Sequence, residues 1–99
     1  MRESAVESAL ARACRRAGFL CFKLAAVGRR GFPDRTILCP GGRIAFVETK
    51  ASKKGPRADQ RLVHRALRRF GFQVFVIDDP DAAEGVVEEI AAANKKGSE

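Results

Sequence analysis

Apolar positions recur along the chain with two different spacings, and these spacings set the expected order of helices and strands. Over residues 4–17, apolar or small side chains recur every three or four positions, which predicts an amphipathic helix ending at Gly18. A similar stripe, made of Leu62, Val63, Ala66, Leu67 and Phe70, predicts a second helix over residues 57–70, and Asp79-Pro80 opens a third that continues to residue 93. Short apolar runs between turn residues predict strands at residues 19–24, 34–39, 43–50 and 72–77.

The order of these elements defines the expected architecture. Pro40-Gly41-Gly42 is typical of a tight turn, so the runs on either side of it are expected to form an antiparallel hairpin. One helix, three strands, a helix, a strand and a last helix predict an α/β fold in which helices flank a mixed sheet. The 99 residues are expected to form one domain over residues 1–94, without room for a regulatory domain, and a polar tail over residues 95–99.

Composition narrows the classes of function. Nineteen Lys and Arg residues against 12 Asp and Glu give a formal net charge of +7, which indicates a polyanionic partner, with nucleic acid ahead of a membrane surface. No apolar run approaches the roughly 20 residues that span a bilayer, and the first ten residues lack the apolar core of a signal peptide. Three cysteines without metal-site spacing are expected to remain thiols, as in a reducing cytoplasm.

Charged side chains are predicted to converge at one end of the hairpin. Alternation along residues 43–50 places Glu48 and Lys50 on the same face as the apolar Phe46. Symmetry about the turn sets Asp34 opposite Thr49, within one residue. Acids on an otherwise apolar face are costly to bury without a positive group, and a divalent cation would supply one. The alternative is a surface ion pair between Glu48 and Lys50, which contributes about 0–1 kcal/mol.

Several motifs occur in an order and spacing that resemble a known nuclease family. They are Gly31-Phe32-Pro33-Asp34-Arg35, Gly41-Gly42-Arg43, Phe46-Val47-Glu48-Thr49-Lys50-Ala51, and Gln60 early in the second helix. The chain resembles the PD-(D/E)xK nuclease superfamily, and more closely a stand-alone VRR-NUC (virus-type replication-repair nuclease) domain. Ser4-Ala5-Val6-Glu7 with Gly18-Phe19 is similar to the start of archaeal Holliday-junction resolvases. The resemblance covers about residues 3–84 and implies a restriction-endonuclease-like αβββαβ core with an extra C-terminal helix.

The resemblance also implies roles for the converging side chains. Asp34, Glu48 and the main-chain carbonyl of Thr49 would bind Mg²⁺ or Mn²⁺, which activates a water for attack on the phosphate. Lys50 would orient or deprotonate that water, or stabilise charge on the phosphoryl oxygens. Thr49 departs from the family pattern, which usually has an apolar residue there. Its side chain is expected to point to the opposite face of the sheet.

Two further side chains have alternative explanations. Glu7 would complete the metal site, with Glu3 as a competitor for this role, or it forms a capping box with Ser4 at the helix start. Gln60 is expected either at the same catalytic site or as a surface amide of the second helix. His64, one helical turn later, is expected to be solvated, because no second histidine and no adjacent nucleophile accompany it.

The basic residues near the predicted site divide into two groups. Those in the flanking strand end and loops are expected to contact DNA phosphates without reading sequence: Lys23, Arg29, Arg30, Lys53, Lys54 and Arg57. Lys23 has the equal alternative of extending its ammonium into water. Those on the outer face of the second helix either bind phosphates or only keep the surface charged: Arg61, Arg65, Arg68 and Arg69.

The sequence therefore favours a metal-dependent, structure-selective DNA endonuclease that acts on Holliday junctions or other branched DNA. A two-fold homodimer would present two sites to a two-fold junction. The chain has no Tyr or Trp, so single-strand recognition by stacking is disfavoured. The main alternative is a basic DNA-binding module that keeps the fold without catalysis, and a metal-free RNA-cleaving relative is disfavoured for lack of a general base. No membrane partner and no small-molecule cofactor are expected, and the expected location is a bacterial or phage-infected cytoplasm.

Overall fold

The computed structural model describes residues 2–24, 30–49 and 55–97 of the chain. The elements, in chain order, are α1 (Arg2–Ala17), β1 (Leu20–Lys23), β2 (Arg35–Cys39), β3 (Arg43–Thr49), α2 (Ala58–Arg69), β4 (Gln73–Ile77), the 3₁₀ turn η1 (Pro80–Ala82) and α3 (Ala83–Gly97). Each begins and ends close to its predicted range. The last helix is the exception, because a 3₁₀ turn precedes it and because α3 continues into the expected polar tail.

The strands form one mixed sheet in the order β1-β2-β3-β4. β1, β2 and β3 are antiparallel neighbours, whereas β4 runs parallel to β3 because α2 connects them as a crossover. The turn at Gly41 and Gly42, both with positive φ, sets a register in which Arg35 pairs with Val47. One more step along this register brings Asp34 opposite Glu48, one residue from the predicted partner. The predicted α/β fold and hairpin are confirmed.

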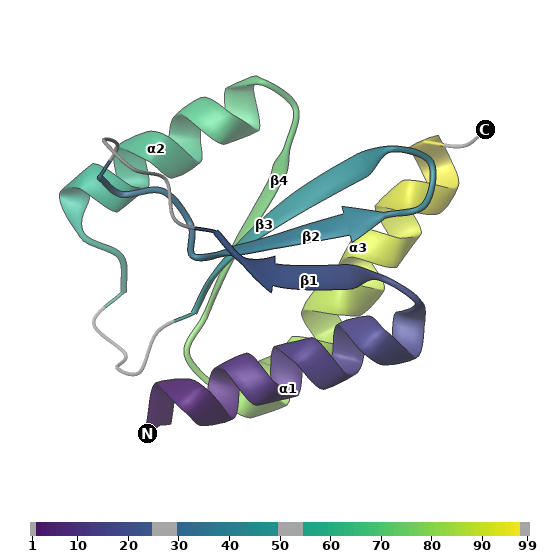
Figure 1. Cartoon of the computed structure of the whole chain (residues 1–99). Coiled ribbons are helices and arrows are strands. Elements are labelled where there is room, and N and C mark those ends of the chain that lie inside the picture. Colours follow the sequence, from purple (N-terminus) through teal and green to yellow (C-terminus); the bar gives the residue numbers. More distant parts are fainter. Residues whose placement is uncertain (1, 25–29, 50–54, 98–99) are drawn as a thin grey trace.

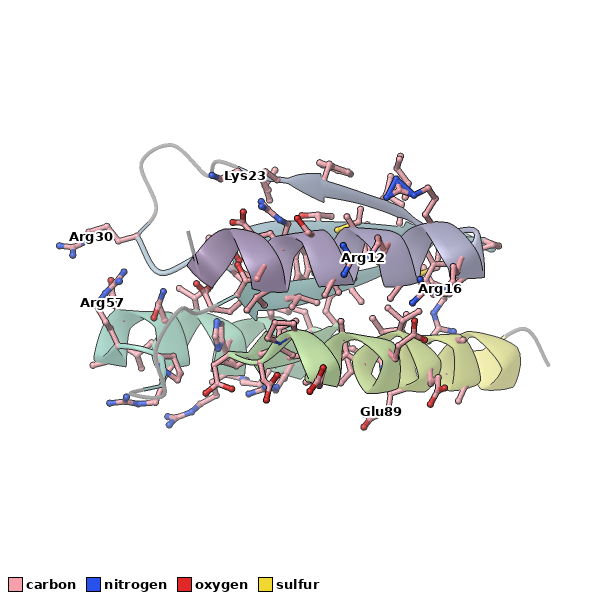
Figure 2. The ribbon with its side chains drawn as sticks, turned by 90° about the horizontal axis from the view of Figure 1, so that it is seen from below. Arg12, Arg16, Lys23, Arg30, Arg57 and Glu89 are labelled. Carbon is pink, nitrogen blue, oxygen red and sulfur yellow. The ribbon has the colours of Figure 1, made fainter. Side chains whose placement is uncertain are left out.

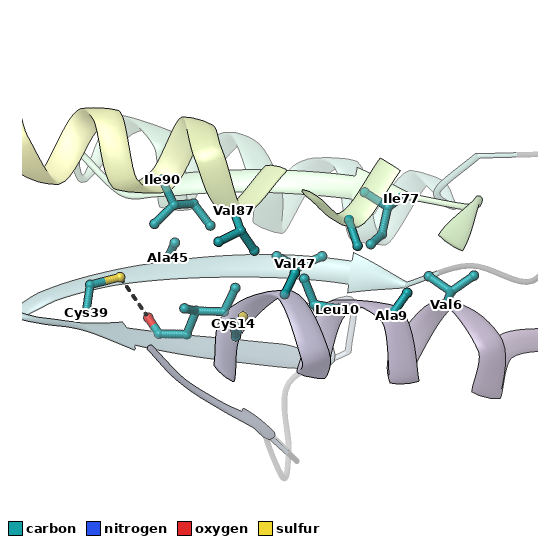
Figure 3. Packing of buried hydrophobic residues seen from close by; sticks show 13 residues of the cluster. Val6, Ala9, Leu10, Cys14, Cys39, Ala45, Val47, Ile77, Val87 and Ile90 are labelled. Atoms are coloured by element: carbon teal, nitrogen blue, oxygen red, sulfur yellow. Dashed lines mark hydrogen bonds between the residues drawn. The ribbon is translucent and has the colours of Figure 1, made fainter. Parts of the chain in front are cut away.

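Helices cover both faces of the sheet, α1 and α3 on one side and α2 on the other (Figure 1). In the larger core, Ala45 and Val47 of β3 lie between Leu10 of α1 and the α3 residues Val87 and Ile90 (Figure 3). None of the three cysteines, all in the described part of the chain, forms a disulfide. None of the described helices is long and apolar enough to cross a bilayer.

The smaller core lies under α2. Phe46 of β3 packs there against Val63 and Leu67. The rings of Phe32 and Phe72 meet Phe46 edge-on, with ring centroids 5.4 and 5.3 Å from its own. The side chains of β3 alternate between the two faces of the sheet. Glu48, two residues after Phe46, therefore lies on the same face as Phe46. The fold thus directs a carboxylate toward α2 at the end of an apolar layer.

Candidate active site

Asp34 is held at the carboxyl end of β3 by a single residue. The main-chain N–H of Thr49 donates to Asp34 Oδ1 over 2.9 Å, and the Thr49 hydroxyl donates to Asp34 Oδ2 over 2.6 Å. The main chain of Asp34 is fixed as well, because its carbonyl accepts from the N–H of Leu24 over 3.1 Å. Thr49 is buried and Asp34 is half-buried, so the carboxylate has a defined orientation at the sheet edge.

Glu48 lies on the neighbouring strand and is only 5% exposed. Its Oε2 accepts a hydrogen bond from Gln60 Nε2 over 3.1 Å, and its Oε1 lies 3.6 Å from His64 Nε2. Both partners come from α2, four residues apart and therefore on the same face of the helix. A carboxylate this deeply buried requires donors or positive charge around it, and α2 supplies them.

Gln60 connects the site to the start of α2. Its Oε1 accepts from the main-chain N–H of Arg57, the residue before the helix, over 2.8 Å. The loop carrying Asp34 meets the helix start at Gly31, where a Cβ would lie 2.5 Å from the carbonyl oxygen of Asp59. The glycine that opens the Gly31–Arg35 motif is therefore required for this loop to pass against α2.

Glu7 is paired with a cation. Its Oε2 lies 2.8 Å from Arg35 Nη2, and both side chains are largely buried. Arg35 also donates to the main-chain carbonyl of Asp34 over 3.3 Å, so Glu7 is joined to the Asp34 segment through Arg35. The capping-box alternative is not supported, because α1 begins at Arg2, before Ser4.

Other predicted site residues divide between the described and undescribed parts of the chain. Lys23, Arg30 and Arg57 lie toward the end of the molecule at which α2 begins (Figure 2). Arg30 and Arg57 both pair with Asp59, at 3.7 and 3.2 Å. Partial burial raises the pKa of Asp59, but the hydrogen bond and charge of Arg57, together with Arg30, hold that pKa below its usual value. Four predicted residues lie outside the described ranges: Arg29, Lys50, Lys53 and Lys54.

The donors at this edge suit a hard divalent cation. Asp34 and Glu48 are carboxylates at the ends of adjacent strands, which lie about 4.8 Å apart, and the carbonyl of Thr49 follows directly. Among the described residues, no three His, Cys, Asp or Glu side chains gather closely enough to hold one ion. Mg²⁺ needs only one or two protein carboxylates, since it keeps several waters. The chemistry of the donor set therefore fits such an ion.

His64 is the residue that sequence reasoning misplaced. It was expected in solvent, yet it is 2% exposed and faces Glu48. The predicted apolar stripe is only partly correct: Val63 and Leu67 are buried, but Leu62 and Phe70 are 63% and 78% exposed. The buried positions of α2 are 60, 63, 64 and 67, a regular helical face. That spacing was present in the sequence but was obscured because two of the four residues are polar.

Two of three comparisons with known proteins found proteins similar to this chain. No family model matches the chain. A phage protein named "Putative nuclease p44", from Acyrthosiphon pisum secondary endosymbiont phage 1, is 40% identical over 81 residues, which are 82% of this chain and 87% of that protein. A solved structure described as a VRR_NUC domain superposes with a TM-score of 0.81 at 30% identity, covering 89% of this chain and 96% of that one.

The αβββαβ core, with Asp34 directly before β2 and Glu48 near the end of β3, is that of a nuclease of the PD-(D/E)xK class. Within that class, the chain belongs to the VRR-NUC family. The resemblance found from the sequence motifs is thereby confirmed.

Proposed function

We propose that this nuclease is a divalent-metal-dependent DNA endonuclease that hydrolyses phosphodiester bonds at Holliday junctions or other branched DNA. The observation that carries the proposal is the pair of oriented carboxylates, Asp34 held by Thr49 and Glu48 held by Gln60, on adjacent strands. A net charge of +7 on 99 residues supports a polyanionic substrate.

Each residue of the site would have one task. Mg²⁺ or Mn²⁺, bound by Asp34, Glu48 and the Thr49 carbonyl, would polarise the scissile phosphate and lower the pKa of the attacking water. Lys50 would orient that water or stabilise charge on the phosphoryl oxygens. Glu7, which already pairs with Arg35, would join through a bridging water.

Gln60 Nε2 donates to Glu48 from α2, while Gln60 Oε1 accepts from the main-chain N–H of Arg57 at the helix start. Because that amide is bound at both ends, the Glu48 carboxylate would meet its ligand without first losing conformational freedom.

Substrate would be held by basic side chains around this edge. The proposed phosphate contacts are Lys23, Arg29, Arg30, Lys53, Lys54 and Arg57. Two copies related by a two-fold axis would place two sites on a four-way junction, so we propose a homodimer. The phage relative supports a role in the cytoplasm of a bacterial or phage-infected cell.

Cleavage of a panel of end-labelled DNAs tests the proposal. Four-way junction, fork, flap, duplex and single strand would each be incubated with Mg²⁺, Mn²⁺ or EDTA. We expect cutting that requires metal, that favours the junction, and that is lost in Asp34→Ala and Glu48→Gln. Glu89→Gln is the matched control, because Glu89 is exposed on α3 (Figure 2) and should leave cutting unchanged.

Two results would contradict the proposal. Tight DNA binding without cutting under every metal would instead identify a non-catalytic binding module. A monomer alone in light scattering, with and without junction DNA, would rule out the homodimer.

A further inference from the structure

A cavity of about 520 Å³ lies against α2 and β4, and arginines dominate its wall. The lining residues that matter here are Arg61, Arg65, Arg68, Arg69, His64 and Val76. We call this cavity the arginine groove. The four arginines are those for which the sequence left two roles open, phosphate binding or a merely charged surface.

The arginines are spaced for an extended ligand. Arg61, Arg65 and Arg69 succeed one another at intervals of four residues, so they lie along one face of α2. Eight residues of helix span about 12 Å. B-form DNA carries one negative charge per about 1.7 Å of its axis, so several phosphates fit along this distance. A row of guanidinium groups matches a polymer of phosphates better than one small anion.

Among the described residues, no acidic side chain lies within ion-pair distance of the groove arginines. Arg61 Nη1 donates to the carbonyl of Pro56 over 2.7 Å, and Arg68 Nη2 donates to the carbonyl of Val74 over 2.6 Å. These neutral acceptors fix the two guanidinium groups but leave their charge available. In the described ranges, none of the four groove arginines forms an ion pair with a carboxylate. By contrast, four other arginines do: Arg16, Arg30, Arg35 and Arg57.

The arginine groove adjoins the proposed reaction centre. His64 lines the groove and also lies 3.6 Å from Glu48 Oε1. Val76, another lining residue, is the register partner of Glu48 across β3 and β4. Adjacent strands lie about 4.8 Å apart, so the groove is level with Glu48 and one strand away. A strand bound there would pass beside the carboxylates.

We propose that the arginine groove binds the phosphate backbone of the nucleic-acid substrate next to the site of cleavage. This inference rests on the proposed function and adds a second contact surface to it, on the side of α2 that faces β4. Guanidinium groups bind phosphate through paired N–H donors, which suits contacts that position a strand without reading its sequence.

The test is the salt dependence of DNA binding, measured by fluorescence anisotropy in EDTA so that nothing is cut. Arg65→Ala/Arg69→Ala removes two exposed groove charges, which, unlike those of Arg61 and Arg68, do not hydrogen-bond to a carbonyl in the described part of the chain. Each lost phosphate contact should lower the slope of log Kobs against log salt by about 0.9, so the slope should become shallower by about 2. Arg65→Lys/Arg69→Lys, which keeps the charges, should restore most of the slope.

Arg12→Ala/Arg15→Ala is the matched control. It removes the same charge from exposed positions of α1, on the opposite face of the sheet, and should leave the slope unchanged. Equal slopes for the two alanine pairs would overturn the proposal that the arginine groove binds phosphates. Wild-type binding that does not depend on salt would also overturn it.

Cleavage assays separate this inference from the proposed function. If the wild type binds through Arg65 and Arg69 but never cuts DNA, the groove stands and the nuclease proposal fails. If Arg65→Ala/Arg69→Ala cuts with unchanged KM and binds with unchanged slope, the groove fails and the nuclease proposal stands.

Discussion

Thr49 binds both oxygens of the Asp34 carboxylate, one through its main-chain N–H at 2.9 Å and the other through its hydroxyl at 2.6 Å. The two contacts fix the plane of the carboxylate and not only its position. The carbonyl of the same Thr49 is a proposed metal ligand, so one residue orients two donors. The hydroxyl contact explains how a polar residue is accommodated where the family usually has an apolar one.

The hydroxyl contact predicts a small, specific loss of activity in Thr49→Val. The main-chain N–H still binds Asp34 Oδ1, but Oδ2 loses its donor. One hydrogen bond contributes about 1 kcal/mol, so the single-turnover cleavage rate should fall about fivefold. Thr49→Ser keeps the hydroxyl and should cut within about twofold of the wild type. Equal rates for the Val and Ser variants would show that the hydroxyl does not orient Asp34.

The buried face of α2 predicts unequal losses of stability when His64 and Leu62 are each replaced by alanine. His64→Ala leaves a cavity and removes a group beside the buried Glu48 carboxylate, so it should cost about 2–4 kcal/mol of unfolding free energy. Leu62→Ala changes a side chain that is 63% exposed and should stay within about 0.5 kcal/mol of the wild type. Urea denaturation measures both.

A larger loss of unfolding free energy for Leu62→Ala than for His64→Ala would contradict this structure and support the buried helix face predicted from the sequence. It would also remove the structural basis for a contact between His64 and Glu48.

The hairpin and α2 show which parts of this structure can be predicted from the sequence and which cannot. Strand alternation and the Gly41-Gly42 turn suffice to bring Asp34 within one residue of its observed partner, because a hairpin register is local. Which face of α2 is buried, by contrast, depends on contacts with residues far away in the sequence. Apolar periodicity assigned Leu62 to the core, whereas the sheet buries His64, because Glu48 on β3 offers it a partner.

The same limit applies to the first helix. The side chain of Glu7 is largely buried on α1. Its pairing with Arg35 depends on how α1 crosses β2, and no spacing along the chain encodes that. The arginine groove has the same origin, because it requires β4 beside α2.

The thiols beside α1 predict an order of chemical reactivity. The hydrogen bond with Cys21 and burial raise the pKa of Cys14, and that same hydrogen bond, with the charge of Arg35, lowers the pKa of Cys21 below its ordinary value of 9.0. Cys21 is also the more exposed. Because a lower pKa gives more thiolate at a given pH, iodoacetamide should modify Cys21 first, as mass spectrometry of digests would show.

A matched variant tests the cause of this order. Cys14→Ala removes the hydrogen bond, so alkylation of Cys21 at pH 7 should become slower and its midpoint should move to higher pH. Faster labelling of Cys14 than of Cys21 in the folded protein would contradict the assignment.

Two glycines with similar backbone angles predict unequal effects of the same substitution. Gly18 and Gly31 have φ of 81° and 86°, so alanine at either should cost about 1–2 kcal/mol in strain. A Cβ at Gly18 meets nothing within 4 Å, whereas at Gly31 it lies 2.5 Å from the carbonyl oxygen of Asp59. Gly31→Ala should therefore cost about 1–3 kcal/mol more in urea denaturation. It should also lower cleavage, because the loop that carries Asp34 is displaced from α2. Equal losses of stability would show that this loop does not pack against the helix start.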